Sequence, residues 1–578
     1  MGESISGGGA PGQPPKEMSM EIRLLLAFLL MGAVMFLTPY FIKTPPPQPP
    51  AKKAETAETA ATAPPEAPPV AAAEAQAEPA SVPAGPATRQ IALPPFVIDT
   101  DLFRVTFSNQ GATVRSWLLK KYKGNDDKQL EITNAAAGME YPFSLYLPGQ
   151  DAAAKTLNWA FFTQTADPDG LGVSFAFSDG RVSSHKTFRF QKNSYILQVS
   201  TDVSLAGKPA PNMIAWRGGF GDLTVANAAS NQRALHFDVS ANKLVDQRSS
   251  AAKNGPVSST GNYSFAGLAD AYFAAVFLPR DNAAVEQTTF TNYVQTPINT
   301  NSQPFVGVAV SDGLENRFDV FVGPKDYDRL GRLNPKLQQL IDFGWIGILA
   351  KPLFLITNWM NDAFVHNYGW SIVLVTVAIN FAMFPLKFSN MKSMRKMQAL
   401  KPQIDAINQK YKGLKLSDPK KADQNQEVMA LYKKNGVNPM GGCFPMLLQL
   451  PFFFAFYKVF MVSAEMRGAS WLWVHDLSQP EQLAIRILPV VMVASQFLMQ
   501  KMTPQPAGDP NQQKMMMFMP LIFGFMFYQF PSGLVLYYLT SNLVGIGQQL
   551  FFNHTAAADE AALSVQPLKP VKKRTVRK

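Results

Sequence analysis

Cysteine, histidine and charged side chains are scarce in this sequence of 578 residues. It has one cysteine, Cys443, and five histidines, and 16% of its residues are charged. One cysteine cannot form an internal disulfide, and the scattered histidines lack the spacing of a metal site. We therefore expect a fold that relies on packing or on a bilayer, with no metal and no cofactor.

Motifs of common catalytic sites are also missing. We find no nucleophile elbow, no phosphate-binding loop and no pair of carboxylates in a recognisable frame. An enzyme that used the large polar segment 96–330 would need a cluster of catalytic residues there. We therefore predict that the chain is not an enzyme, and we assign no catalytic residue.

The chain is basic, with 53 Lys and Arg against 42 Asp and Glu and a net charge of +11. Such an excess suits nucleic acid or anionic lipid. The positive residues gather beside long apolar segments, which is typical of a membrane protein. We therefore expect anionic lipids as partners and no recognition of a specific nucleic-acid sequence.

Six apolar segments predict transmembrane helices. The first, 22–43, is too long for a signal-peptide core and lacks a small-residue cleavage site, so we expect an uncleaved anchor. The second lies in the region 352–387 and contains Trp370–Lys387, which is apolar for about five helical turns. The other four lie in 442–553.

Outside the anchor, the N-terminal half of the chain contains three segments of different composition. Residues 1–21 are rich in Gly, Pro and Ser and predict a disordered tail, while 44–95 is a Pro- and Ala-rich linker that cannot bury a core. The segment 96–330 has short alternating runs between Gly and Asn/Asp clusters, which predict a large β-sandwich. Three of its runs are interpreted as strands: Phe103–Phe107, Lys186–Phe190 and Tyr195–Val203, with a tight turn at Lys192-Asn193.

Three further segments are predicted from their charge and periodicity. Residues 335–351 resemble an amphipathic helix lying in the membrane interface. Residues 388–441 are strongly basic, with one apolar stripe at helical spacing followed by a second helix start at Ser417–Pro419, which indicates a helical hairpin on a membrane surface. Residues 554–578 form a basic tail. Because positive loops stay inside, the hairpin, the tail and both termini are expected in the cytoplasm and the sandwich outside.

Polar side chains recur inside the predicted spans. In the last span Tyr538, Ser541 and Asn542 fall at i, i+3 and i+4, on one helix face. The earlier spans add four polar residues: Thr376, Asn380, Gln449 and Gln496. None of the spans offers an ion-binding carboxylate of the kind that a proton- or ion-driven transporter places at mid-membrane.

Asn380 has two possible roles. An amide in hydrocarbon is costly unless it is bonded or hydrated, so Asn380 either bonds a neighbouring helix or lines a wet cavity. The polar residues of the other spans favour a cavity that accepts polar peptide. Lys387 follows about two turns later and would bring positive charge to the mouth of that cavity.

Several motifs of the C-terminal half resemble the bacterial YidC/Oxa family of membrane protein insertases, closely and in order over 342–553. Residues 96–330 look like the less uniform periplasmic domain of that family. The motifs are Gly442–Pro445, Gln449–Pro451, Trp473–Ser478, Gln500–Met502, Gln513-Lys514, Met519-Pro520, Phe530–Tyr538 and Ser541–Leu543.

The resemblance implies a five-helix core with a hydrophilic groove, open to the cytoplasm and to lipid but closed outside. Incoming apolar segments would leave along the third and fifth spans. Thr376, Tyr537 and Tyr538 stand where the family's groove meets substrate. The family usually has a positive residue at the position of Asn380, and this chain departs from that pattern.

These observations predict the fold class and the function together. The fold class is a polytopic α-helical membrane protein of six spans, with a periplasmic β-sandwich and a cytoplasmic hairpin. It would insert and chaperone nascent membrane proteins in the inner membrane, alone or with the Sec translocon; a secondary transporter is the alternative. Ribosomes, targeting factors or lipid would bind basic residues: Lys392, Arg395, Lys396, Lys572, Lys573 and Arg574.

Overall fold

The computed structural model describes residues 91–134, 140–225, 228–280, 284–296, 298–411, 413, 420–436, 444–503 and 510–564. The chain divides into two compact units. One comprises Met1–Pro79 and Pro402–Gly436, and the other comprises Ala80–Lys401 and Val437–Lys578. The predicted anchor over 22–43, nearly all of the linker over 44–95 and most of the basic tail lie outside the described residues.

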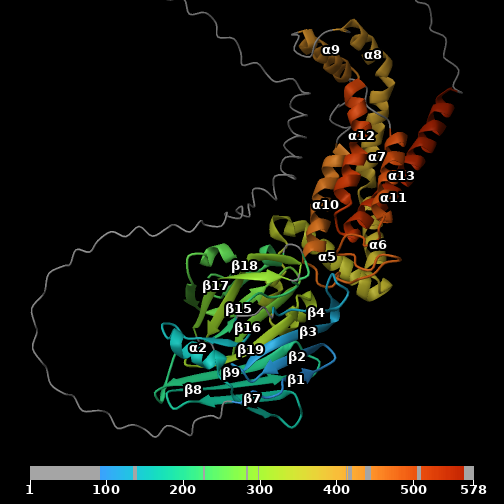
Figure 1. The fold of residues 1–578 in the computed structure, drawn as a ribbon. Coiled ribbons are helices and arrows are strands. Elements are labelled where there is room, and N and C mark those ends of the chain that lie inside the picture. Colours follow the sequence, from blue (N-terminus) through green and yellow to red (C-terminus); the bar gives the residue numbers. More distant parts are fainter. Residues whose placement is uncertain are drawn as a thin grey trace, which may run out of the picture. The chain divides into compact units, whose positions relative to one another are not determined.

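The second unit contains a β-rich domain of three antiparallel sheets within the part of the chain that is described (Figure 1). The first sheet has the order β1 (Phe96–Asp99), β2 (Phe103–Ser108), β3 (Thr113–Lys123) and β4 (Gln129–Glu131). The second has β13 (Lys243–Gln247), β12 (Arg233–Asp238), β15 (Tyr263–Ala269), β16 (Phe273–Pro279), β19 (Glu315–Pro324), β9 (Ile196–Leu205), β8 (Val182–Phe190), β7 (Gly172–Ser178) and β6 (Thr163–Ala166), with β10 (Lys208–Pro209) beside β9. The third has β14 (Val257–Gly261), β17 (Val285–Thr296), β18 (Asn299–Ser311), β11 (Met213–Trp216) and β5 (Ser144–Tyr146).

The three predicted strands are confirmed as β2, β8 and β9. β8 and β9 form the expected hairpin, in register from Val182 opposite Leu205 to Phe190 opposite Leu197. Asn193 in the turn has a positive φ of 59°, which Asn tolerates better than most residues. From Leu197 to Val203 every second residue of β9 is buried, as a strand with one core face requires.

Aromatic side chains join the sheets into one core. The ring of Phe103 on β2 lies 5.5 Å from that of Phe190 on β8, so the first two sheets pack against each other. Trp117 on β3 lies 6.2 Å from Trp216 on β11, which brings in the third sheet. Large buried aromatic surfaces contribute most of the stabilisation of such a core. The predicted β-rich domain is therefore confirmed.

The continuous helix predicted over 335–351 is not present. Three helical pieces replace it: 3-10 turns over Pro335–Leu340 and Gly344–Ile346, then α5 over Gly347–Met360. Gly344 has a positive φ of 59°, which a right-handed helix cannot contain. The predicted apolar face persists, because Trp345 and Ile348 are 83% and 90% exposed.

The second predicted span is also shorter than expected. After α5 come a π-helical turn, η4 (Asn361–Val365), then α6 (Tyr368–Ala382) and α7 (Phe384–Ala399). α6 therefore ends five residues before the predicted boundary at 387, and α7 runs across that boundary. Pro385 stands in the first turn of α7, where a missing N–H costs nothing, so a new helix begins there.

The remaining helices of the second unit are α10 (Phe444–Val462), α11 (Ile487–Met502), α12 (Pro510–Phe527) and α13 (Ser532–Ser564), which run alongside one another in Figure 1. Among the described residues no single helix combines the length and apolar character needed to cross a membrane. The segments Gly344–Val365 and Tyr368–Ala382 meet that test only as a pair, with a bend of 116° between them.

The first unit contains α8 (Lys401–Lys410) from Pro402 onward and α9 (Lys420–Lys434). Lys410 and Tyr411 both bond Glu427, at 2.5 and 2.9 Å, and Gln424 donates to Asn408 at 2.7 Å. Two helices are thus joined by polar side chains within the predicted hairpin segment. Their cytoplasmic position stays a prediction.

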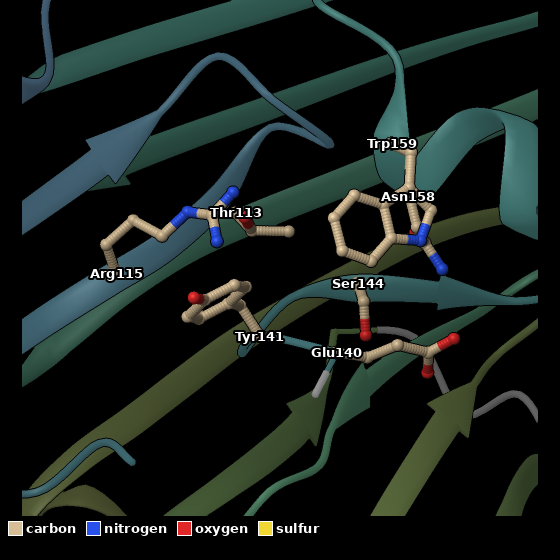
Figure 2. Close-up of a pocket in the computed structure, with 7 residues that line it drawn as sticks. All are labelled: Thr113, Arg115, Glu140, Tyr141, Ser144, Asn158 and Trp159. Carbon is tan, nitrogen blue, oxygen red and sulfur yellow. The ribbon is translucent and has the colours of Figure 1, made fainter. Parts of the chain in front are cut away.

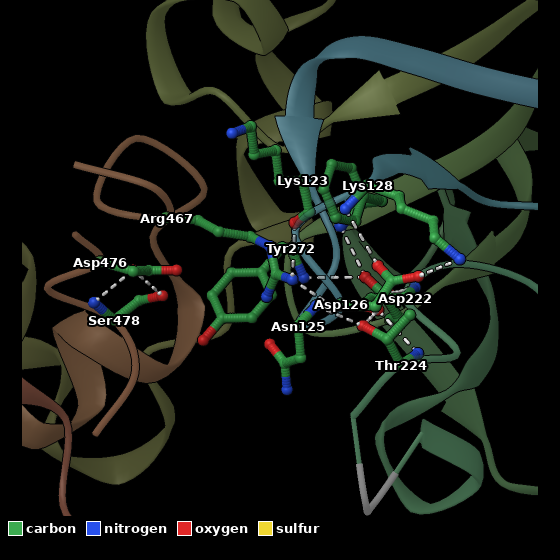
Figure 3. A network of polar contacts seen from close by, with 12 residues as sticks. Lys123, Asn125, Asp126, Lys128, Asp222, Thr224, Tyr272, Arg467, Asp476 and Ser478 are labelled. Carbon is green, nitrogen blue, oxygen red and sulfur yellow. Dashed lines mark hydrogen bonds and ion pairs between the residues drawn. The ribbon is translucent and has the colours of Figure 1, made fainter. Parts of the chain in front are cut away.

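A buried polar network joins the β-rich domain to the segment between α10 and α11 (Figure 3). Arg467 forms an ion pair with Asp222 and donates to the carbonyl of Lys123 at 3.3 Å. Its guanidinium lies 5.0 Å from the centre of the Tyr272 ring, and Tyr272 Oη donates to the carbonyl of Phe460 at 3.4 Å. The C-terminal end of α10 is therefore tied to the β-rich domain.

Glu465 adds a second tie in the same segment. One carboxylate oxygen accepts from the backbone N–H of Tyr327 at 2.9 Å, and the other accepts from Ser463 Oγ at 2.9 Å. Burial raises the pKa of Glu465 to about 7, and the nearby charge of Asp326 acts in the same direction. This contact therefore contains a carboxyl group that titrates near neutral pH.

Candidate functional site

Polar side chains from α6, α7, α10, α11 and α13 meet among apolar helices, and we call this group the polar cluster. Its members are Thr376, Asn380, Lys387, Gln449, Ser495, Gln496, Tyr537, Tyr538, Ser541, Asn542 and Gln548. Most of them are less than 9% exposed, whereas Lys387, Gln449, Gln496 and Tyr538 are half-buried. The predicted groove residues of the spans therefore lie together.

Asn380 is the centre of the polar cluster. Its Nδ2 donates to the carbonyl of Thr376 at 2.8 Å, and its Oδ1 accepts from Lys387 Nζ at 2.5 Å and from Ser541 Oγ at 3.3 Å. Its own backbone carbonyl accepts from Gln548 Nε2 at 3.1 Å. Asn380 is 3% exposed, and its side-chain amide has hydrogen-bond partners on α6, α7 and α13. A buried amide is therefore satisfied here.

Gln449 connects α10 to this centre. Its Nε2 donates to Tyr537 Oη at 2.5 Å and to Ser541 Oγ at 3.3 Å. The Tyr537 ring, 1% exposed, stacks on Phe456 with ring centres 4.4 Å apart. Gln449 is therefore linked to Asn380 indirectly: it donates to the hydroxyl of Ser541, which in turn donates to Asn380 Oδ1.

A second branch links α11 to α13. Asn542 Nδ2 donates to Ser495 Oγ at 3.1 Å, and Gln496 Nε2 lies 3.5 Å from Tyr538 Oη. Gln496 Oε1 is buried and has no hydrogen-bond partner among the described residues. Since buried carbonyl oxygens are normally paired, this atom calls for water or an incoming polar group.

Thr376 differs from the other predicted groove residues. Its hydroxyl donates to the carbonyl of Ile372 in its own helix at 2.6 Å, and the side chain is fully buried. In this arrangement Thr376 supplies its backbone carbonyl to Asn380 and offers no free hydroxyl. Its predicted contact with substrate stays a prediction.

Local interactions fix the two helices that carry the second branch. The carboxylate of Glu481 accepts from the backbone N–H groups of Ile487 and Leu488, at 3.0 and 2.8 Å, and so caps the start of α11. At the start of α13, a Cβ on Gly533 would lie 2.3 Å from the Phe460 ring. The missing side chain at Gly533 therefore lets α13 approach α10 closely.

Gln548 and Ser495 belong to the polar cluster although the sequence did not assign them to the site. Both are polar residues in predicted spans, but neither lies in the motif positions that indicated a groove. The available signal was that a Gln at 548 and a Ser at 495 interrupt apolar helices. Only the packing of α13 on α6 and on α11 shows which partner each one has.

The predicted basic contacts fall into two groups. Lys392 and Lys396 are exposed on α7, and Arg395 beside them is half-buried. Lys572, Lys573 and Arg574 lie outside the described residues. No group of three or more His, Cys, Asp or Glu side chains that could hold a metal occurs in the described ranges.

A small hollow in the β-rich domain has a cavity volume of about 10 Å3, which is room for a single water (Figure 2). Arg115 in its lining lies over the Tyr141 ring at 3.6 Å, and Glu140 pairs with Arg217 at 2.6 Å. Asn158 bonds both backbone groups of Leu145, at 2.8 Å each, and so covers this edge of β5. Arg115, Glu140 and Asn158 of the lining are therefore already in contact with other groups, whereas Ser144 Oγ has no hydrogen-bond partner among the described residues.

Comparison with known proteins identifies the family. Residues 359–559 match the family described as 60Kd inner membrane protein, and residues 96–356 match the YidC periplasmic domain. A membrane protein insertase YidC from Ralstonia nicotianae is 32% identical over 517 residues, which cover 87% of this chain and 90% of that protein. The insertase YidC of Geotalea daltonii is 32% identical over 93% of this chain and 100% of that protein.

Among solved structures, the chain is similar to an active YidC insertase whose first transmembrane domain is resolved. That likeness has 20% identity and a TM-score of 0.36, and covers 80% of this chain and 94% of the other. The sequence relatives and the two family matches place the chain at a bacterial inner membrane, with a β-rich domain of the periplasmic type. The chain belongs to the YidC family of membrane protein insertases.

Proposed function

We propose that this chain inserts nascent membrane proteins into the inner membrane and assists their folding, using the polar cluster as a hydrated groove. The relatives that share most of its length are named membrane protein insertases. The observation that carries the proposal is the polar cluster itself: eleven polar side chains meet among apolar helices, and Gln496 Oε1 and Gln548 Oε1 have no partner among the described residues.

Such a groove works without a nucleotide. A charged side chain at mid-membrane costs about 3 kcal/mol or more, and hydrogen-bonding groups with water reduce that cost for a short polar tail. The apolar segment that follows then partitions into lipid, gaining about 25 cal/mol per Å2 of apolar area removed from water. The gain from the apolar segment therefore outweighs the cost of moving the tail.

Asn380 and Lys387 have distinct parts in this proposal. Asn380 supplies hydration and hydrogen bonds at the centre of the polar cluster. Lys387, whose ammonium lies 2.5 Å from Asn380 Oδ1, supplies the positive potential that a neutral amide cannot. The positive residue usual for the family is thus replaced, in this chain, by a cation that reaches the same place from α7.

The topology that we propose has six spans and both termini in the cytoplasm, with the β-rich domain in the periplasm. The clustering of Lys and Arg in 388–441 and 554–578 supports it. Single cysteines introduced between 100 and 320, after replacement of Cys443, should be labelled from outside intact cells. Those between 390 and 435 should not, and the opposite pattern would contradict the orientation.

Ribosomes, targeting factors, the Sec translocon and anionic lipids are the proposed partners. Exposed Lys392 and Lys396 on α7 and the basic residues after 570 support the contacts with ribosomal RNA and with lipid headgroups. The Sec translocon follows from the family rather than from a surface of this chain. No reaction chemistry is proposed for any residue.

Reconstitution tests the function directly. The purified protein in liposomes should insert a small single-span coat-type protein, detected by protease protection, with neither nucleotide nor ion gradient present. The rival secondary transporter needs a mid-membrane carboxylate, and α6, α10, α11 and α12 contain no Asp or Glu. If the reconstituted protein inserts the substrate only when an ion gradient is imposed, the result would favour the secondary transporter.

A further inference from the structure

The backbone between α6 and α7 is broken beside the centre of the polar cluster. α6 ends at Ala382, and α7 starts at Phe384 with Pro385 in its first turn. The last four carbonyls of a helix have no donor within that helix, and Pro385 has no N–H to offer the carbonyl of Phe381, four residues before it. Asn380 is among these last four residues of α6, so its carbonyl needs a donor from elsewhere.

Gln548 on α13 supplies that donor. Its Nε2 lies 3.1 Å from the Asn380 carbonyl oxygen, and the side chain is 6% exposed. Its Oε1 is buried without a partner among the described residues, so the contact with Asn380 is the interaction that fixes this amide. A buried amide that is half satisfied is costly, and packing alone would favour an apolar residue here.

Lys387 depends on the same break. It lies in the first turn of α7, and its ammonium reaches back across the break to Asn380 Oδ1 at 2.5 Å. The position of α7 relative to α6 therefore decides whether this ammonium lies in the polar cluster. Gln548 contacts the last turn of α6 at Asn380, the same residue whose side chain accepts from Lys387. Gln548 and Lys387 are therefore linked through Asn380.

We propose that Gln548 is a positioning residue: by holding the Asn380 carbonyl it fixes the α6–α7 break, and so keeps the Lys387 ammonium in the polar cluster to receive substrate segments that carry carboxylates. This inference rests on the proposed insertase function. The substrate class that depends on Gln548 is therefore acidic-tailed membrane proteins, whereas neutral-tailed ones do not require it.

Gln548→Met tests this, because Met keeps the length of Gln but cannot donate. The matched control is Gln549→Met, since Gln549 is 1% exposed and bonds Asn553 within α13 at 3.0 Å. In the full-length protein in liposomes, Gln548→Met should lower insertion of an Asp/Glu-tailed single-span substrate at least about five-fold, the size of one lost hydrogen bond. Insertion of the same substrate with an Asn/Gln tail, and both substrates with Gln549→Met, should stay unchanged.

A chemical measurement follows the position of Lys387 independently of insertion. The rate of amine acetylation at Lys387, measured by mass spectrometry against half-buried Lys458 on α10 as reference, should rise in Gln548→Met and not in Gln549→Met. Gln548→Met combined with Lys387→Gln should insert the acidic-tailed substrate no worse than Lys387→Gln alone. If Gln548→Met fails to accumulate, Gln548→Glu is measured in the same way.

The outcomes separate the two ideas. An unchanged Lys387 acetylation rate, or equal loss for acidic and neutral tails, would overturn the positioning role while leaving the insertase function standing. Additive losses in the double variant would do the same. Failure of the unmodified protein to insert either substrate would overturn the proposed function, while the acetylation rates would still decide whether Gln548 holds Lys387.

Discussion

Arg467, in the segment between α10 and α11, forms an ion pair with Asp222 of the β-rich domain, and each side chain is 2% exposed. Arg467 Nε and Nη1 are buried and have no hydrogen-bond partner among the described residues. A buried pair gives little net stability, but removing one partner leaves an uncompensated charge. The pair therefore serves mainly to specify how the end of α10 meets the β-rich domain.

Breaking this pair should be more harmful than removing it. Asp222→Asn is expected to lower the free energy of unfolding by about 3 kcal/mol, because the Arg467 charge stays buried. The double variant Arg467→Met with Asp222→Asn should recover much of that loss. Thermal unfolding of the purified protein in detergent measures both, and an equal loss in the single and double variants would contradict the prediction.

An exposed ion pair provides the control. Arg104 and Asp99 lie 2.6 Å apart with side chains 53% and 38% exposed. Such a pair contributes about 0–1 kcal/mol, since water screens both charges. Asp99→Asn should therefore shift the unfolding midpoint far less than Asp222→Asn.

Glu465, in the same segment between α10 and α11 as Arg467, makes the stability of the folded protein dependent on pH. Burial raises its pKa in the folded protein to about 7, from an ordinary value near 4.5, so folding favours the protonated form. The stability that this group contributes is complete below pH 4.5 and is lost as the pH rises through about 7, a span worth up to about 3 kcal/mol. The folded protein should be less stable at pH 8 than at pH 5 on account of Glu465.

Glu465→Gln isolates this effect. The amide can still accept from the Tyr327 N–H and bond Ser463, but it does not titrate in this range. Unfolding midpoints of the unmodified protein and of Glu465→Gln should converge at pH 5 and separate at pH 8, with the variant more stable. Asp326, whose charge also raises the pKa of Glu465, is present in both proteins and so cancels in the comparison. A constant difference across the pH range would rule out titration of Glu465.

Asn380→Leu should depress insertion of polar-tailed substrates and affect fully apolar ones less. The substitution removes the amide that joins Lys387 to Ser541, so the centre of the polar cluster loses its hydrogen bonds. Several-fold slower insertion in liposomes is expected, since one to two hydrogen bonds of about 1 kcal/mol each are lost. If only thermal stability falls and every substrate inserts normally, Asn380 is an interhelical packing residue.

Lys387→Gln should slow acidic-tailed substrates selectively. The side chain keeps a donor for Asn380 but loses the positive charge. Asn380→Arg should restore insertion of acidic tails in the Lys387→Gln background, because it returns a cation to the polar cluster from α6. Equal rates for acidic and neutral tails in Lys387→Gln would show that the charge at 387 has no part in substrate choice.

Replacing the five positive residues of Val571–Lys578 by Gln should weaken ribosome binding while a short, post-translationally delivered substrate still inserts. The contact is electrostatic, so the loss should be largest below about 0.1 M salt. The Debye length there exceeds about 10 Å, and the charges are screened least. Ribosome co-sedimentation with reconstituted vesicles measures it. Unchanged co-sedimentation at every salt concentration would indicate that the tail is only solvated.

Much of the architecture was predictable because it depends on local patterns. Alternating apolar residues predicted β2, β8 and β9, and the Lys192-Asn193 turn between two of them is confirmed. Motif order in the C-terminal half indicated the family, and polar residues at helical spacing indicated which side chains share a face. The breaks at Gly344 and at Met383 escaped prediction, because the apolar periodicity continues through both.

The sequence by itself determined which side chains are available to a membrane-embedded site: amides, hydroxyls and a few lysines, with no Asp or Glu in α6, α10, α11 or α12. Only the tertiary structure decided their partners. Gln548 and Asn380 are 168 residues apart, and Arg467 and Asp222 are 245 residues apart. Helical period relates residues within one helix, whereas the choice between one amide and the next on a neighbouring helix depends on how those helices pack.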